Sequence, residues 1–139
     1  MKRPERWLAV LLWAMGILLL SALVPTFMPF AWMQKIHREL QLGELPYMPI
    51  TVYLTRSLSL LYAVHGGLLI YVAGDVRRHL PVVKCLGGLA VAFGLVMLGI
   101  DLAAGMPWPW VAAEGPFIAA GGAAIVWLAA RTTAADRSE

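Results

Sequence analysis

Three ionisable residues lie inside stretches of the chain that are otherwise almost entirely apolar: Arg56, Asp101 and Glu114. One cation and two anions in such surroundings could form a structural ion-pair cluster, or they could bind an ion, a proton or a polar ligand. An unpaired charge in a bilayer is costly, so each side chain is expected to face neighbouring helices and not lipid. The sequence therefore predicts a binding or ion-pair cluster of these residues, and both interpretations stay open.

His65 is a secondary candidate, together with Tyr62 on its side of the same predicted helix. His65 is nine residues after Arg56, which places it about 180° round the helix from the arginine. A neutral histidine hydrogen-bonded to another helix is favoured over a proton relay or a quinone contact. The two other histidines, His37 and His79, lie outside the apolar stretches, so no metal or haem ligand set is predicted.

Catalytic motifs are absent from the sequence. It contains no G-x-S-x-G, no H-E-x-x-H and no phosphate-binding loop. The one cysteine, Cys85, rules out an intramolecular disulfide and a CxxC redox motif. We therefore expect no enzyme activity and no cofactor.

Arg56, Asp101 and Glu114 are expected to lie on membrane helices. The chain of 139 residues is 60% hydrophobic and 14% charged, whereas soluble domains carry about 25% charged residues. A membrane helix needs roughly 20 mostly apolar residues. Four segments meet this requirement: about 7–24, 51–73, 82–104 and 110–130. A polar tail at 131–139 follows the last of them. The first is too long for the apolar part of a typical signal peptide. The sequence predicts an all-α protein: one membrane domain folded as an up-down bundle of four helices.

The basic residues predict the orientation of these spans. Eight of the 11 lysines and arginines fall at the two ends of the chain and in the 74–84 turn, which places both termini in the cytoplasm. Arg56, Asp101 and Glu114 then lie at one level, roughly 5–8 Å below the outer boundary of the membrane. Small residues share their helical faces and predict close helix contacts, notably Ala63 and Gly67 beside Arg56.

The loop before the second span contains "AWMQKIHRELQLG", which has amphipathic helical spacing. Trp32, Met33, Ile36 and Leu40 share one face of this predicted helix. We expect residues 31–42 to form an interfacial helix on the extracytoplasmic side of the membrane, with Gly43 as its stop.

Three segments carry a family resemblance: "LTRSLSLLYAVHGGLLIY", the basic turn "DVRRHLPVVK" and the glycine-rich "LGGLAVAFGLVML". Over residues 52–98 the chain resembles the small four-span bacterial membrane proteins of the DoxX-like group. The resemblance implies a four-helix bundle in the bacterial cytoplasmic membrane. It implies little about activity; the roles proposed for such families are those of accessory subunits of redox systems.

These patterns favour a non-enzymatic membrane protein, either an accessory subunit or a binder of a lipid or small apolar molecule. One alternative is a small oligomeric proton-coupled transporter that uses Glu114 or Asp101. Another is a membrane enzyme with His65 as acid or base. The expected partners are the lipid bilayer and a membrane protein or a second copy of the chain. The basic residues are explained by topology, so no nucleic-acid partner is expected.

Overall fold

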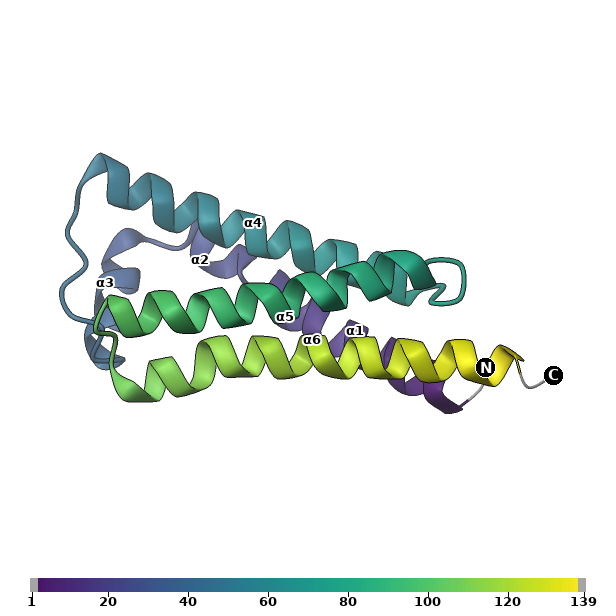
Figure 1. Cartoon of the computed structure of the whole chain (residues 1–139). Helices are drawn as coiled ribbons and strands as arrows, with labels where there is room; N and C mark the ends of the chain where they lie inside the picture. Colours follow the sequence, from purple (N-terminus) through teal and green to yellow (C-terminus); the bar gives the residue numbers. More distant parts are fainter. Residues whose placement is uncertain (1–2, 138–139) are drawn as a thin grey trace. The chain divides into compact units, whose positions relative to one another are not determined.

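The regular structure of the described chain is entirely helical. The computed structural model describes residues 3–137, and for residues 135–137 it describes the backbone alone. Six helices follow one another in this range, without a β-strand (Figure 1): α1 Arg3–Leu20, α2 Leu23–Phe27, α3 Phe30–Glu39, α4 Pro49–Ala73, α5 Leu80–Ala103 and α6 Trp108–Arg137. This confirms the predicted all-α class. Lys2 and the last two residues of the expected tail lie outside the described residues.

Four segments are long and apolar enough to cross a membrane, as the sequence predicts. They are Arg3–Phe27, Pro49–Ala73, Leu80–Ala103 and Trp108–Ala134, each 24 to 27 residues long. The first continues through α2, beyond Pro25, where the expected span ended. Pro25 is the third residue of α2, in the first turn, where a missing backbone N–H removes no helical hydrogen bond. α6 also continues as a helix through most of the segment expected as a polar tail.

Each of these segments carries large apolar side chains that are more than half exposed, among them Leu18, Leu61, Leu89 and Phe117. A contiguous apolar surface of this kind would be unfavourable in water. In a bilayer the same side chains are solvated by lipid tails. The exposure pattern therefore agrees with lipid contact along the helices.

The chain divides into two compact units. Unit 1 comprises the described parts of Met1–Trp13 and Tyr71–Glu139, and unit 2 is Ala14–Ile70. The boundaries fall inside α1 and α4, so each of these helices contributes to both units.

In unit 1, α5 and α6 are antiparallel and their backbones touch at glycines. A Cβ atom added to Gly94 would lie 2.6 Å from the Gly115 carbonyl oxygen, and one added to Gly122 would lie 2.6 Å from the Gly87 carbonyl oxygen. Such close approach is typical of membrane helices, which gain their contact energy from backbone packing. The predicted small-residue contacts of these two helices are confirmed.

Polar contacts link the helices of unit 1 at the end that contains the start of α1 and the end of α6. Arg77 donates from Nε to Glu5 Oε2 at 2.9 Å, which links the start of α1 to the turn after α4. Lys84 donates to the Thr133 hydroxyl at 2.8 Å, which links α5 to the end of α6. The Thr132 and Thr133 hydroxyls donate in turn to carbonyls one helical turn earlier, so these threonines are compatible with the extension of α6.

In unit 2, the second half of α1 packs on α4 through Gly16 and Gly66. A Cβ atom at Gly66 would lie 2.6 Å from the Gly16 carbonyl oxygen, whereas one at Gly67 would meet no atom within 4 Å. Within unit 2, Gly67 does not make the predicted contact, and its neighbour Gly66 makes it instead. Ala63, three residues before Gly66, is buried as predicted.

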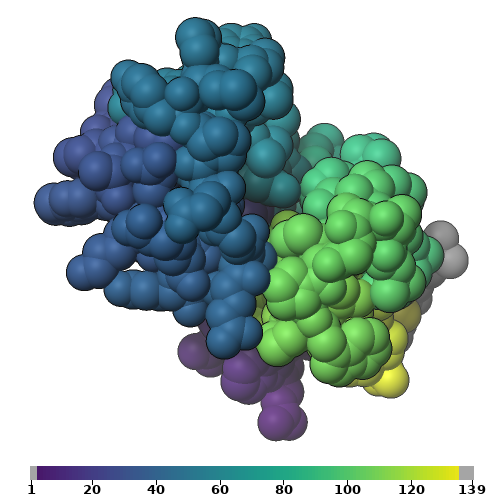
Figure 2. Space-filling view, turned by 90° about the vertical axis from the view of Figure 1, so that its left-hand side faces the viewer, coloured from purple at the N-terminus to yellow at the C-terminus, as the bar shows by residue number. Residues whose placement is uncertain are grey.

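α3 and the loop that follows it gather on the face shown in Figure 2, together with the start of α4. Phe30 and Met33 of α3 are buried, and Phe30 packs edge-to-face on Tyr47 of the loop, with 5.2 Å between ring centroids. Trp32, Ile36 and Leu40 are exposed, so the apolar face predicted for this helix is split between the interior and the surface. The helix ends at Glu39, before the predicted stop, since Gln41 already adopts a positive φ of 58°.

Candidate functional site

A pocket of about 560 Å³ lies in unit 2 between the α2–α3 region, the loop and the start of α4. Nine residues line it: Thr26, Phe27, Tyr47, Pro49, Val52, Tyr53, Arg56, Ser57 and Leu60. Most of this lining is apolar or aromatic, and the volume is within the range of about 300–1,000 Å³ usual for small-ligand sites. The lining contains neither a carboxylate nor a histidine.

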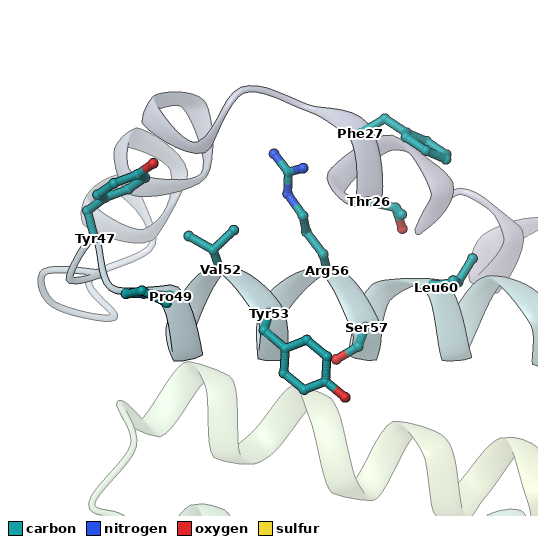
Figure 3. Close-up of a pocket in the computed structure, with 9 residues that line it drawn as sticks. All are labelled: Thr26, Phe27, Tyr47, Pro49, Val52, Tyr53, Arg56, Ser57 and Leu60. Carbon is teal, nitrogen blue, oxygen red and sulfur yellow. The ribbon is translucent and has the colours of Figure 1, made fainter.

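Arg56 supplies the positive charge of this pocket. Its side chain leaves α4 on the side that faces α2 and α3, together with Val52, and extends between Tyr47 and Phe27 (Figure 3). One Nη atom donates to the Met28 carbonyl oxygen at 3.4 Å, which is long for such a hydrogen bond. This contact holds the guanidinium at the pocket and leaves most of its N–H groups available.

Unit 2 contains two carboxylates, one on α3 and one in the loop after it, and both form ion pairs. Glu39 pairs with Lys35 and Glu44 pairs with Arg38, each at 3.8 Å. Among the described residues of unit 2, Arg56 has no ion-pair partner. The pocket therefore carries a net positive charge within its own unit.

The other polar groups of the lining are hydroxyls. The Thr26 hydroxyl donates to the Ala22 carbonyl and the Ser57 hydroxyl donates to the Leu54 carbonyl, so both hydrogens are already used. Among the described residues, neither the Tyr47 nor the Tyr53 hydroxyl has a hydrogen-bond partner. Tyr47 lies on the same side of α4 as Arg56, whereas the Tyr53 ring lies on the other side (Figure 3). The remaining donors on the side of Arg56 are therefore the guanidinium and the Tyr47 phenol.

The two predicted carboxylates lie in unit 1, near the turn between α5 and α6. Asp101 is 3% exposed, and its Oδ2 atom has no hydrogen-bond partner among the described residues. Glu114 accepts a short hydrogen bond from Trp110 Nε1, one helical turn earlier, and interacts electrostatically with Asp101. The structure therefore brings these two predicted residues near each other.

The predicted residues divide between the units. Arg56, Tyr62 and His65 belong to unit 2, whereas Asp101 and Glu114 belong to unit 1, so the meeting of all three charges stays a prediction. Tyr62 and His65 are half-buried in α4 and do not line the pocket. No hydrogen bond joins the His65 ring to another described residue of unit 2. Within residues 3–137, no group of three or more histidine, cysteine, aspartate or glutamate residues is placed to hold a metal ion.

Sequence reasoning found only one residue of this pocket, Arg56. It gave Thr26 and Phe27 no role. The available signal was the concentration of tyrosine and proline just before and around the arginine, in "LPYMPITVYLTR". The contribution of α2 gave no sequence signal, since it depends on how the chain returns through α3.

The four long apolar helices define the class of the protein: a small multi-span membrane protein in contact with the lipid bilayer. The chain matches no family model, no curated protein and no solved structure. The resemblance to DoxX-like proteins thus has no support from these comparisons beyond the shared number of long apolar helices.

Proposed function

We propose that this protein binds a lipid or small apolar molecule in the pocket around Arg56, without transforming it chemically. The observation that carries the proposal is the pocket of about 560 Å³, with an apolar and aromatic lining and one cation inside it. A few polar groups in a mainly apolar cavity are the usual composition of a ligand site. A pocket is not needed by a purely accessory subunit, and it therefore favours the binding interpretation.

The proposed setting is the cytoplasmic membrane of a bacterium, with both termini in the cytoplasm and α3 on the outer side. The distribution of lysine and arginine supports this orientation. In this setting Arg56 lies a few residues inside the outer boundary of α4, where a long cationic side chain can reach the headgroup region. The exposed Trp32 and Ile36 suit a helix that lies at that interface.

Native mass spectrometry of the protein, taken from its membranes in mild detergent, tests the proposal. We expect a stoichiometric adduct that survives purification and is lost in Arg56→Ala. Arg38→Ala is the matched control, since Arg38 is an exposed cation of the same unit outside the pocket. A bare protein in every preparation, with Arg56→Ala merely less stable, would refute binding and favour the predicted cluster of Arg56 with Asp101 and Glu114.

A second candidate function, a small proton-coupled transporter, is favoured by the buried Asp101. Its Oδ2 atom, which has no partner in the described chain, and the neighbouring Glu114 are the kind of groups that proton pathways use. This candidate predicts that Asp101→Asn and Glu114→Gln fold normally but abolish proton uptake into proteoliposomes, followed with a pH-sensitive dye. Unchanged uptake in both variants would reject it.

A further inference from the structure

We infer that the ligand of the Arg56 pocket is an anionic amphiphile, with a carboxylate or phosphate head group on the guanidinium and its apolar chain along α4. This inference rests on the proposed binding function and adds the chemical class of the ligand.

Arg56 gives the pocket a positive charge that no carboxylate of its unit neutralises. The guanidinium of Arg56 is permanently protonated, and both carboxylates of unit 2 pair with Lys35 and Arg38. The Met28 carbonyl at 3.4 Å satisfies one N–H group but contributes no negative charge. An arginine fork matches the geometry of a carboxylate or a phosphate, which it binds through two parallel hydrogen bonds.

The hydrogen-bond inventory points the same way. The hydroxyls of Thr26 and Ser57 donate to backbone carbonyls, whereas the Tyr47 hydroxyl keeps its hydrogen. On the side of α4 that carries Arg56, the described side chains of the pocket thus present free donors from Arg56 and Tyr47, while the Tyr53 ring lies on the other side (Figure 3). A head group that only accepts hydrogen bonds, as an ionised carboxylate or phosphate does, complements this set.

The apolar lining places the chain of the ligand. Leu60 is one helical turn after Arg56, and Phe27 is at the end of the first candidate span, so both provide apolar contacts beside the arginine. Under the proposed orientation, Leu60 lies about 6 Å deeper in the membrane than Arg56. An amphiphile would therefore bind with its head towards the outer surface and its chain towards the bilayer centre, as a lipid of the outer leaflet is oriented.

The exposure of the lining indicates how such a ligand enters. Phe27, Tyr47, Tyr53 and Leu60 are all exposed, so the pocket is open at its apolar side. A ligand with a long chain can leave part of that chain in the bilayer while its head group occupies the pocket. The site therefore does not need to enclose the whole molecule.

The test compares probes that share one chain and differ in the head group. The full-length protein in a non-ionic detergent is titrated with oleate, oleyl phosphate and oleyl alcohol, and occupancy is followed by native mass spectrometry. We expect both anions to bind at least about tenfold more tightly than the alcohol, the factor that one charge-assisted hydrogen bond contributes. Acetate and inorganic phosphate, which have the head groups without the chain, should bind far more weakly.

Variants test whether the preference for anionic probes depends on the Arg56 guanidinium. Arg56→Gln should remove the preference for the anions and leave oleyl alcohol binding unchanged, and Arg56→Lys should restore part of the preference. Arg38→Gln should behave as the wild type. Should Arg56→Gln not fold, the comparison of probes on the wild-type protein still decides the question.

The outcomes separate the two proposals. Equal affinity for oleate and oleyl alcohol overturns the anionic class but leaves the binding function standing. Binding of inorganic phosphate as tight as that of oleyl phosphate overturns the amphiphile and identifies a free-anion site. If none of the amphiphiles binds above the detergent background, both proposals fail.

Discussion

Gly66 gives the sharpest test of the packing in unit 2, because its neighbour Gly67 is a control at the same depth in the same helix. In Gly66→Ala the new Cβ atom would lie 2.5 Å from the Leu20 nitrogen, 2.6 Å from the Gly16 carbonyl oxygen and 3.0 Å from the Leu19 carbonyl carbon. All three are backbone atoms of the α1 segment, so no side-chain rotation relieves the clash. At Gly67 the same atom meets nothing within 4 Å.

The magnitude follows from this geometry. Ordinary van der Waals contact begins at 3.4 Å, so α1 and α4 must separate by about 1 Å at this point. A gap of that size removes a quarter to half of the dispersion energy of each separated atom pair. Overpacking of this kind costs about 1–3 kcal/mol, so we expect Gly66→Ala to lower the free energy of unfolding by that amount and Gly67→Ala to leave it nearly unchanged.

The assay is unfolding in mixed micelles of increasing dodecyl sulfate content, followed by far-ultraviolet circular dichroism. Gly16→Ala adds an intermediate case, since the nearest atom to its new Cβ is the Ile70 Cγ1 at 2.7 Å, which belongs to a side chain that can move. From the most to the least stable variant, the expected order is Gly67→Ala, Gly16→Ala and Gly66→Ala. Equal stability of the Gly66 and Gly67 variants would show that the helices do not meet at Gly66.

Three further predictions concern unit 1 and the topology. Arg77→Gln should lower the free energy of unfolding by about 1 kcal/mol, because Arg77 is 47% exposed and its ion pair with Glu5 is partly screened. A double-mutant cycle with Glu5→Gln measures this coupling, and a coupling of zero would contradict it. Asp101→Asn should fold with unchanged or higher stability, because it removes the charge of a buried group whose Oδ2 atom has no partner in the described chain. A marked loss of stability would instead support pairing with Arg56. A reporter that is active only outside the cytoplasm should be silent when fused to the C-terminus, and activity there would overturn the proposed orientation.

The all-α class and the number of long apolar segments were predictable because they depend on local composition. A stretch of about 20 apolar residues has one stable backbone conformation in lipid, the helix, whatever surrounds it. Small residues likewise indicated that helices approach one another closely, and Gly94 and Gly115 make such a contact. The choice between Gly66 and Gly67 was not predictable, since adjacent residues differ by about 100° in direction and only the position of α1 decides which one is covered.

The helix boundaries also depend partly on local sequence and partly on packing. The first span was expected to end at about residue 24, but the short α2 continues past Pro25 and places this proline in its first turn, where the missing N–H removes no helical hydrogen bond. The loop helix was predicted near its observed position because its spacing is amphipathic. Its apolar residues divide between Phe30 and Met33 inside and Trp32 outside, which depends on the contact of Phe30 with Tyr47.

The sequence by itself determined the class of the protein, since hydropathy along the chain decides which segments lipid can solvate. It also identified Arg56, because a charge in an apolar segment stands out without any structure. Only the tertiary structure decided what surrounds that arginine: Thr26 and Phe27 come from a segment 30 and 29 residues earlier in the chain, brought back by the turn through α3. A pocket is a property of such long-range contacts, and these depend on packing between helices, which local sequence does not encode.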